Sequence, residues 1–219
     1  MFSVIMPSYL GEYPSCAQDR HAKFLRAVDS VMSQSFMDWE LRIVSDGCDD
    51  TVELAKRFAG SARVRISKIP KQNLWSGVPR NTGIKEATGD WIIYLDTDDM
   101  WGPEHLSIVS RGLKEGVVKD WAYFNDWYWD GEAFKERLCD INRYGKHGTS
   151  NIVHRRDLVA WWPQSKGANY AHDRHFIAEL KSKGAGVRIG TPRYFVCHDV
   201  ERVNDAARPV PVLKSKFDV

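Results

Sequence analysis

The sequence of 219 residues has few cysteines, and none of them pair in a metal-binding or redox motif. The four are Cys16, Cys48, Cys139 and Cys197. Cysteines spaced this widely predict neither a zinc site nor a disulfide framework. They favour a reduced, cytoplasmic setting, since disulfides persist mainly in oxidising compartments.

The sequence also lacks a long apolar run and a strong imbalance of charge. No segment approaches the roughly 20 apolar residues that a membrane-spanning helix needs, and the opening MFSVIMPSY lacks the basic region of a signal peptide. Lys and Arg number 31 against 29 Asp and Glu, a net charge of +2. Such a balance argues against a nucleic-acid partner. We expect a soluble cytoplasmic protein, with peripheral membrane contact at most.

What the first hundred residues do contain is a regular alternation of strand and helix patterns. The strand patterns cover residues 2–7, 39–47, 63–69 and 90–96, and the helix patterns cover 22–34, 49–60 and 78–89. This alternation predicts an α/β fold with a mostly parallel sheet covered by helices on both faces. Ligands of such sheets bind at the carboxyl ends of the strands.

The second half of the chain is less regular. It predicts helices at 103–115 and 170–184, and strands at 121–129, 149–157 and 193–199. The strand at 121–129 is rich in tryptophan, and a tail with prolines begins near residue 207. No repeat or linker divides the chain, so we expect a single domain over residues 1–219.

Three aspartates follow the buried pattern WIIYL: Asp96, Asp98 and Asp99. Asp96 and Asp98 are two positions apart, so in an extended chain they project to the same side. Two carboxylates on one side suit Mg²⁺ or Mn²⁺, with substrate phosphates completing the ligand shell. The alternative is a solvated acidic turn that caps the next helix, for which aspartate is also common. These residues alone leave both interpretations open.

Other candidate residues stand at the ends of predicted strands or at the start of a helix. Asp46 ends the second strand, where it is placed to accept a hydrogen bond from a nucleotide base, and Tyr9 is placed to offer its ring to the same base. Asp173 lies in or before the first turn of a helix, where the dipole alone also favours an acid. His198 follows the last strand and is a candidate metal ligand, although a single histidine there is more often structural.

Three blocks in this order resemble the family 2 glycosyltransferases, which are inverting enzymes with the GT-A fold. The blocks are SVIMPSY, AVDSVMSQSFMDWELRIVSDGCDDT and GVPRNTGIKEATGDWIIYLDTDDMW, all within residues 3–101. After residue 102 the resemblance is carried by TSNIVHRR and HDRHFIAELKSKG. It implies a nucleotide-sugar-binding half at 1–101, an acceptor-binding half at 102–206 and a C-terminal tail at 207–219.

The resemblance also implies roles for residues of the donor site. Pro7 and Tyr9 belong to it, with Tyr9 stacking on the base and Asp46 hydrogen-bonding to that base. Arg80 and Asn81 lie in a segment that the family places beside the donor.

For the chemistry, Asp96 and Asp98 match the family's D-x-D pair, with Asp98 the more direct metal ligand. Asp173 matches the catalytic base, although the family's E-D reads His172–Asp173 here. His198 falls near a late histidine that some GT-A enzymes place on the metal. The loop from Leu10 to Asp19 is longer than the family usually shows, and its role stays open.

The function implied is metal-dependent, inverting transfer of a sugar from a nucleotide-diphosphate donor to an acceptor hydroxyl. The resemblance favours a UDP-sugar, Mn²⁺ or Mg²⁺, and a glycan or lipid-linked acceptor in surface glycan or polysaccharide synthesis. One alternative is a sugar-1-phosphate nucleotidyltransferase. The segment PSYLGEYPSC argues against it, because it lacks the glycines and basic residues of a phosphate loop. The other is a carbohydrate- or nucleotide-binding module without catalysis.

Overall fold

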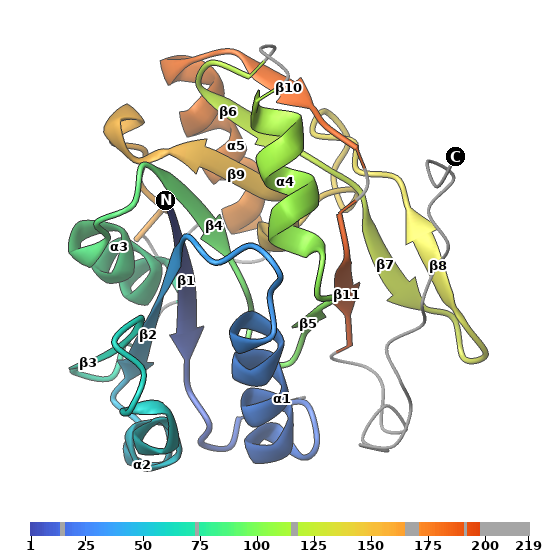
Figure 1. The fold of residues 1–219 in the computed structure, drawn as a ribbon. Coiled ribbons are helices and arrows are strands. Elements are labelled where there is room, and N and C mark those ends of the chain that lie inside the picture. The colour runs from blue at the N-terminus through green and yellow to red at the C-terminus, as the bar shows by residue number, and fades with distance from the viewer. Residues whose placement is uncertain (14–15, 73–74, 115–117, 165–170, 191, 198–219) are drawn as a thin grey trace.

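Figure 1 shows the fold as a computed structural model, which describes residues 1–13, 16–72, 75–114, 118–164, 171–190 and 192–197. The larger of two sheets has seven strands in the order β10-β6-β9-β4-β1-β2-β3. Their bounds are β1 (Phe2–Ser8), β2 (Trp39–Asp46), β3 (Val64–Ile69), β4 (Trp91–Tyr94), β6 (Trp121–Tyr123), β9 (Ile152–Arg155) and β10 (Gly186–Arg188). All neighbouring strands are parallel except that β9 runs antiparallel to β4 and β6. The predicted mostly parallel α/β sheet is confirmed.

Helices cover both faces of this sheet, as the alternating pattern predicted. Their bounds are α1 (Arg20–Met32), α2 (Asp49–Ala55), α3 (Gly77–Glu86), α4 (His105–Lys114) and α5 (His172–Lys183), with short 3-10 helices η1 (Lys56–Phe58), η2 (Thr149–Asn151) and η3 (Arg156–Leu158). Successive strand residues point to opposite faces. Val4 and Met6 therefore join the core under α1, α2 and α4, and Ile5 joins the core under α3 and α5. Figure 1 shows α1 and α4 on the near face.

Helix α1 illustrates how the apolar spacing produces this packing. Phe24, Ala27, Val28 and Val31 lie on one face of the helix and are fully buried. Burying a side chain the size of valine or phenylalanine contributes about 1.5–3 kcal/mol. Packing of this face against the sheet therefore stabilises α1 far more than its intrinsic helix propensity does.

A smaller sheet lies beside the larger one, and it corrects one prediction. Its order is β5-β11-β7-β8, with β5 (Met100–Trp101), β7 (Asp126–Trp129), β8 (Phe134–Arg137) and β11 (Tyr194–Val196). The prediction of one strand over 121–129 is wrong, because the chain leaves the large sheet after β6 and enters the small sheet at β7. Asn125 marks the break: it is 4% exposed, accepts a hydrogen bond from the Cys139 amide at 3.0 Å, and donates to Glu136.

The parallel strands bring several loops to one edge of the molecule. The arrowheads of β1 and β2 point to the same edge in Figure 1, and β4 runs parallel to β1. The segments that follow these strands are therefore neighbours. Within the part of the chain that the structure describes, no helix is long and apolar enough to cross a bilayer.

Candidate active site

A cleft of about 740 Å³ opens at this edge, between the first and second halves of the chain. The structure brings most of the predicted site residues to it. The predicted residues that line it are Pro7, Tyr9, Asp46, Arg80, Asp96, Asp98 and Asp173. Loops that follow three separate strands therefore meet the start of α5 around one cavity, as the strand-end rule requires.

The three aspartates after β4 do not continue the strand as the sequence analysis assumed. The chain turns there, with the Asp99 amide donating to the Asp96 carbonyl at 3.2 Å. Asp96 and Asp98 both line the cleft although the backbone between them is a turn and not extended. The Asp98 carbonyl accepts a hydrogen bond from Arg26 of α1 at 2.7 Å, which ties the turn to the body of the protein.

The repulsion among these carboxylates is relieved in two ways. Arg80 donates to Oδ1 of Asp96 at 2.7 Å and is itself almost fully buried. Asp99 is a buried part of the cleft wall, where it accepts hydrogen bonds from the Tyr194 hydroxyl at 2.8 Å and the Cys197 amide at 2.7 Å. Burial, reinforced by the charges of Asp98 and Asp96, raises the pKa of Asp99 well above its ordinary value. Asp99 thus joins the turn to β11.

Asn81 is the predicted donor-site residue that does not line the cleft. Its side chain is 1% exposed and exchanges two hydrogen bonds with the backbone of Trp162, both at 2.9 Å. Because these bonds use both ends of the amide, Asn81 anchors the segment around Trp162 against α3. Arg80, one residue earlier on the helix, points to the cleft instead.

Tyr9 and Asp46 form one end of the cleft together with a residue that sequence reasoning missed. Lys71 lies 2.9 Å from Oδ2 of Asp46, and its ammonium stands 4.1 Å from the centre of the Tyr9 ring. The Gln72 amide donates to the other oxygen of Asp46 at 2.7 Å. A Cβ at Gly47, which has a φ of +68°, would lie 2.6 Å from Lys71. Glycine there allows the two loops to approach.

The long loop after β1 folds back onto Tyr9. The Tyr13 and Tyr9 rings are stacked with centroids 6.4 Å apart, and the guanidinium of Arg20 lies 4.6 Å from the Tyr13 ring. Arg20 also donates to the backbone carbonyls of Tyr9 and Gly11. Tyr13 and Arg20 both line the cleft, so the insertion contributes to the wall next to the aromatic ring.

Asp173 stands at the start of α5, on the wall supplied by the second half. Its Oδ1 accepts a hydrogen bond from the Thr149 hydroxyl at 3.0 Å and lies 3.1 Å from Nε2 of His172. Burial raises the pKa of this carboxyl. The hydrogen bond and charge of His172, the charge of Arg80 and the Thr149 hydrogen bond together outweigh burial and hold the pKa below its ordinary value. Asp173 is therefore ionised at neutral pH.

An aromatic surface adjoins this carboxylate. The Trp75 ring is stacked on His172 with centroids 5.7 Å apart and an angle of 16° between the planes. Trp75 lines the cleft and is 43% exposed, which is high for so large an apolar side chain. A flat, accessible indole beside a carboxylate suits the apolar face of a sugar ring.

Several cleft residues escaped the sequence analysis for a common reason. Lys71 follows β3, so the strand-end rule would have found it if applied to that strand. Trp75 and Arg137 belong to no recognisable motif, and Thr149 begins the segment TSNIVHRR, which named no site residue. All three reach the cleft only through the tertiary fold.

Asp96 and Asp98 are the cleft residues that would hold a divalent cation. Among the described residues, no three Asp, Glu, His or Cys side chains form a ready-made metal site. Asp96 and Asp98 nevertheless supply two hard oxygen ligands, and Mg²⁺-type sites commonly use one or two carboxylates plus substrate phosphates. His198, the third predicted ligand, lies outside the described residues.

The mostly parallel sheet covered by helices defines the class of fold, GT-A. The sequence profile of "Glycosyl transferase family 2" matches residues 3–171, and the chain belongs to this family. The resemblance noted in the sequence is confirmed, and with it the GT-A fold class.

Two relatives illustrate the similarity in sequence. The chain is 29% identical over 118 residues to the Escherichia coli UDP-Glc:alpha-D-GlcNAc-diphosphoundecaprenol beta-1,3-glucosyltransferase WfgD, covering 53% of this chain and 43% of that protein. It is 28% identical over 118 residues to the Staphylococcus aureus poly(ribitol-phosphate) beta-N-acetylglucosaminyltransferase TarS, covering 52% of this chain and 19% of that protein. The chain thus spans less than half of these relatives.

Solved structures show the same fold at low identity. TarS residues 1–349 in complex with UDP-GlcNAc match with a TM-score of 0.71 and 17% identity, covering 95% of this chain and 61% of that one. The Pyrobaculum calidifontis mannosyltransferase PcManGT, in complex with GDP-Man and Mn²⁺, matches with a TM-score of 0.64 and 15% identity, covering 90% and 56%.

Proposed function

We propose that this protein transfers a sugar from a nucleotide-diphosphate donor, with a UDP-sugar favoured, to an acceptor hydroxyl with inversion at the anomeric carbon. The observation that carries the proposal is the convergence of Tyr9 and Asp46, the Asp96–Asp98 turn and an ionised Asp173 on one cleft. The UDP-sugar complex of TarS and the UDP-Glc in the name of WfgD support the choice of nucleotide.

The base of the donor binds at the end of the cleft formed by Tyr9 and Asp46. The Tyr9 ring supplies a stacking surface, and Asp46 accepts a hydrogen bond from a base N–H. Lys71 and the Gln72 amide hold the Asp46 carboxylate in position before the nucleotide arrives. Because the carboxylate is already ordered, binding of the nucleotide loses less side-chain entropy.

The diphosphate lies toward the turn, where Asp96 and Asp98 would hold Mn²⁺ or Mg²⁺. When bound, the cation neutralises charge that develops on the leaving diphosphate. The chain's own contribution is to keep the turn rigid through the Arg26–Asp98 carbonyl bond and the Arg80–Asp96 ion pair. The Mn²⁺ named with PcManGT supports this choice of cofactor.

Asp173 acts as the general base. Its low pKa keeps it ionised, so it can accept the proton of the acceptor hydroxyl as that oxygen attacks the anomeric carbon. The Thr149 hydroxyl and His172 orient the carboxylate. A single displacement assisted in this way inverts the anomeric centre and needs no nucleophile from the protein.

The acceptor sugar binds against Trp75. Its indole is exposed in the cleft and is held by stacking on His172, the residue next to the proposed base. A sugar ring packed on that surface would bring a hydroxyl close to Asp173. The names of WfgD and TarS, which carry diphosphate-linked and ribitol-phosphate acceptors, support an acceptor in surface glycan synthesis.

A nucleotide panel tests the proposal. The chain is mixed with UDP-glucose, UDP-GlcNAc, UDP-galactose or GDP-mannose, with Mn²⁺ or with EDTA, and thermal unfolding and nucleotide release are followed. A donor present at 100 times its Kd should stabilise the fold by about 2.7 kcal/mol. Asp98→Ala should abolish the part of this stabilisation that depends on Mn²⁺. NMR of the product reports the anomeric configuration.

Two results would contradict the proposal. If no nucleotide-sugar stabilises the folded chain, the donor site is wrong. A cell extract can then be added as the source of acceptor. If a donor binds but no product forms with any such extract, the alternative of a binding module without catalysis is favoured. Membership of family 2 already sets aside the nucleotidyltransferase.

A further inference from the structure

A second cavity, of about 880 Å³, adjoins the candidate active site and has the opposite balance of charge. Its charged lining comprises four basic residues and two acidic ones: Arg137, Arg143, Lys146 and Arg188 against Glu136 and Asp140. The active-site cleft has four Lys and Arg against six Asp and Glu: Arg20, Lys71, Arg80 and Arg137 against Glu12, Asp46, Asp96, Asp98, Asp99 and Asp173. The excess of acidic residues in the active-site cleft favours binding of a cation, and the excess of basic residues in the second cavity favours binding of an anion.

Arg137 connects the two cavities, because it lines both of them. Its Nε and Nη2 donate to the two oxygens of Asp126, at 2.8 and 2.5 Å, and Asp126 is fully buried. This bidentate pair fixes the plane of the guanidinium. It uses two of the five N–H donors, and 37% of the side chain remains exposed. Arg137 is therefore a rigid cationic group on the wall between the cavities.

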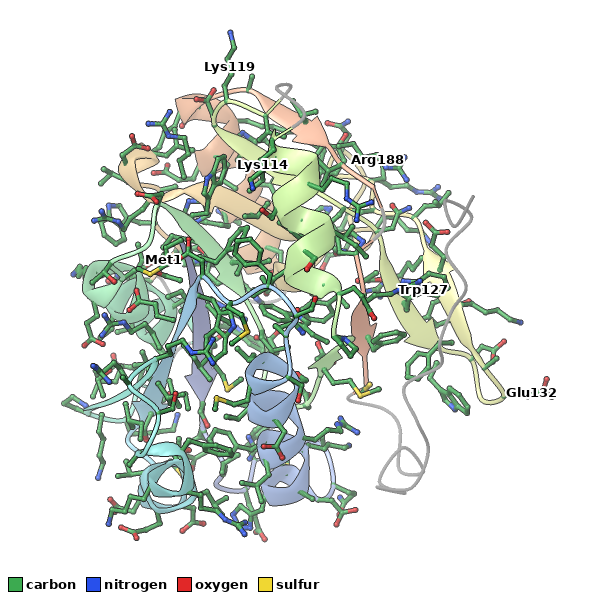
Figure 2. All side chains as sticks on the ribbon, in the orientation of Figure 1. Met1, Lys114, Lys119, Trp127, Glu132 and Arg188 are labelled. Carbon is green, nitrogen blue, oxygen red and sulfur yellow. The ribbon has the colours of Figure 1, made fainter. Side chains whose placement is uncertain are left out.

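Arg188 is also held in place before any ligand arrives. Its Nη2 donates at 2.7 Å to Oδ1 of the buried Asn125, whose other contacts are the Cys139 amide and Glu136. Figure 2 shows Arg188 extending from β10 on the side where β7 and β8 lie. These hydrogen bonds fix the position of the Arg188 guanidinium in the wall of the second cavity.

The remaining two basic residues stand on a closed turn. The Asp140 amide donates to the Lys146 carbonyl at 2.8 Å, and the Lys146 amide donates to the Arg143 carbonyl at 3.2 Å. Gly145, with a φ of +70°, allows the turn to close. Arg143 and Lys146 are both exposed on it, so the turn presents two cations at the cavity.

We propose that the second cavity binds a phosphate group of the acceptor, either a phosphodiester or a diphosphate, while the acceptor sugar occupies the active-site cleft. This rests on the proposed function, since it names a feature of that acceptor. Arginine forks match phosphate oxygens in pairs, and two of the four basic residues here are preset arginines. The donor's own phosphates belong in the acidic cleft, where a cation accompanies them, so the basic cavity is available for a second anion.

The test is a direct binding measurement on the full chain by calorimetry. UDP with Mn²⁺ is titrated first, and this titration measures the Kd of the donor site alone. Two probes then follow, with and without UDP and Mn²⁺ at saturation: a glycerol-phosphate tetramer, which carries phosphodiesters, and decyl diphosphate, which carries a lipid-linked diphosphate. Octyl β-D-glucoside is the uncharged comparison.

The variant pair Arg143→Gln/Lys146→Gln should weaken binding of the phosphate probe about tenfold or more, and it should leave the Kd of UDP unchanged. Its matched control is Lys114→Gln/Lys119→Gln, which removes the same charge from exposed residues that line neither cavity. Figure 2 shows Lys119 projecting outward at the far end of the molecule. The control should bind the probe as the unmodified chain does.

Each outcome has a definite meaning. Tighter binding of the tetramer assigns a polymeric phosphodiester acceptor, and tighter binding of decyl diphosphate assigns a lipid-linked one. Failure of both probes at millimolar concentration, or equal losses in the two variant pairs, overturns the proposal. Failure of UDP to bind refutes the proposed function instead, and the titrations without UDP still decide the phosphate site.

Discussion

Arg80 and Asp96 form an ion pair 2.7 Å long in which the arginine is almost fully buried, at 3% exposure, and the aspartate is 32% exposed. The same guanidinium lies against the Trp162 ring, 4.6 Å from its centre, and its charge lowers the pKa of Asp173. Arg80 therefore acts on both the proposed metal-binding turn and the proposed base. Loss of the pair would cost the arginine more than the aspartate, because the buried guanidinium cannot be hydrated again whereas the carboxylate is partly exposed.

Asp96→Asn should destabilise the fold, since it leaves the Arg80 charge buried without its partner. We expect a loss of about 1–3 kcal/mol in the free energy of unfolding, below the range for a fully buried pair because Asp96 is partly exposed. Urea unfolding measures it. The matched control is Asp157→Asn, which breaks the exposed pair with Arg155 and should cost less than about 1 kcal/mol. Equal losses would show that the burial of Arg80 does not matter.

Asp173→Asn should separate binding from catalysis. The amide keeps the shape of the carboxylate but cannot accept a proton, so turnover should fall about 10²- to 10⁴-fold. The Kd of UDP in Mn²⁺ should be unchanged, because the donor residues lie on the first half of the chain. Initial rates and calorimetry on the same preparation check both parts. Turnover equal to that of the unmodified chain would remove Asp173 as the base.

The pH dependence of turnover should follow the Asp173 carboxyl. Its pKa is lowered, so the active ionised form persists as pH falls and the acid limb of kcat/KM lies below the ordinary value of 3.8. Thr149→Val removes one hydrogen bond that lowers this pKa. The acid limb should then move to higher pH, with kcat at neutral pH little changed. A shift to lower pH would contradict the proposed role of Thr149.

Trp75→Ala should raise the KM for the acceptor and leave kcat and donor binding nearly unchanged. Aromatic stacking contributes about 0.5–1.5 kcal/mol, which corresponds to a KM about two- to tenfold higher. Trp75→Phe keeps a ring and should recover part of the affinity. If Trp75→Ala lowers kcat alone, the indole orients His172 and Asp173 without contacting the acceptor.

Buried His105 should make the fold sensitive to mild acid. The side chain is fully buried against Trp101, and burial lowers its pKa from 6.5 to about 3. As pH falls below 6.5 the unfolded chain takes up a proton that the folded chain does not, so stability present above that pH is lost. Between pH 7 and pH 5 this costs about 2 kcal/mol.

His105→Phe removes the titrating ring and keeps an aromatic side chain beside Trp101. The variant should lose about 2 kcal/mol less than the unmodified chain over the same pH range, measured as the free energy of unfolding in urea at pH 7 and pH 5. Parallel losses in the two proteins would show that His105 is not the group responsible. His154, whose pKa is also lowered by burial, to about 4, contributes a similar loss to both proteins.

Much of the fold was readable from local pattern. The alternating segments of the first hundred residues predicted the strands, the helices and the parallel pairing, and the residues after β1, β2 and β4 were correctly expected at one edge. The division at 121–129 was not readable, because aromatic residues typical of strands stand on both sides of Asn125 and do not show that the chain enters a second sheet there. Strands β5, β8 and β10 have two to four residues, too few for a periodic signal.

The sequence by itself determined the family, the α/β layering and the positions of Tyr9, Asp46, Asp96 and Asp98, because each depends on residues close together in the chain. Only the tertiary structure decided that Arg80 pairs with Asp96, that Asp99 bonds to β11, that Thr149 reaches Asp173 and that Trp75 stacks on His172. These relationships join segments up to about a hundred residues apart. Contacts over such separations depend on how the elements pack, and no local pattern of residues encodes that packing.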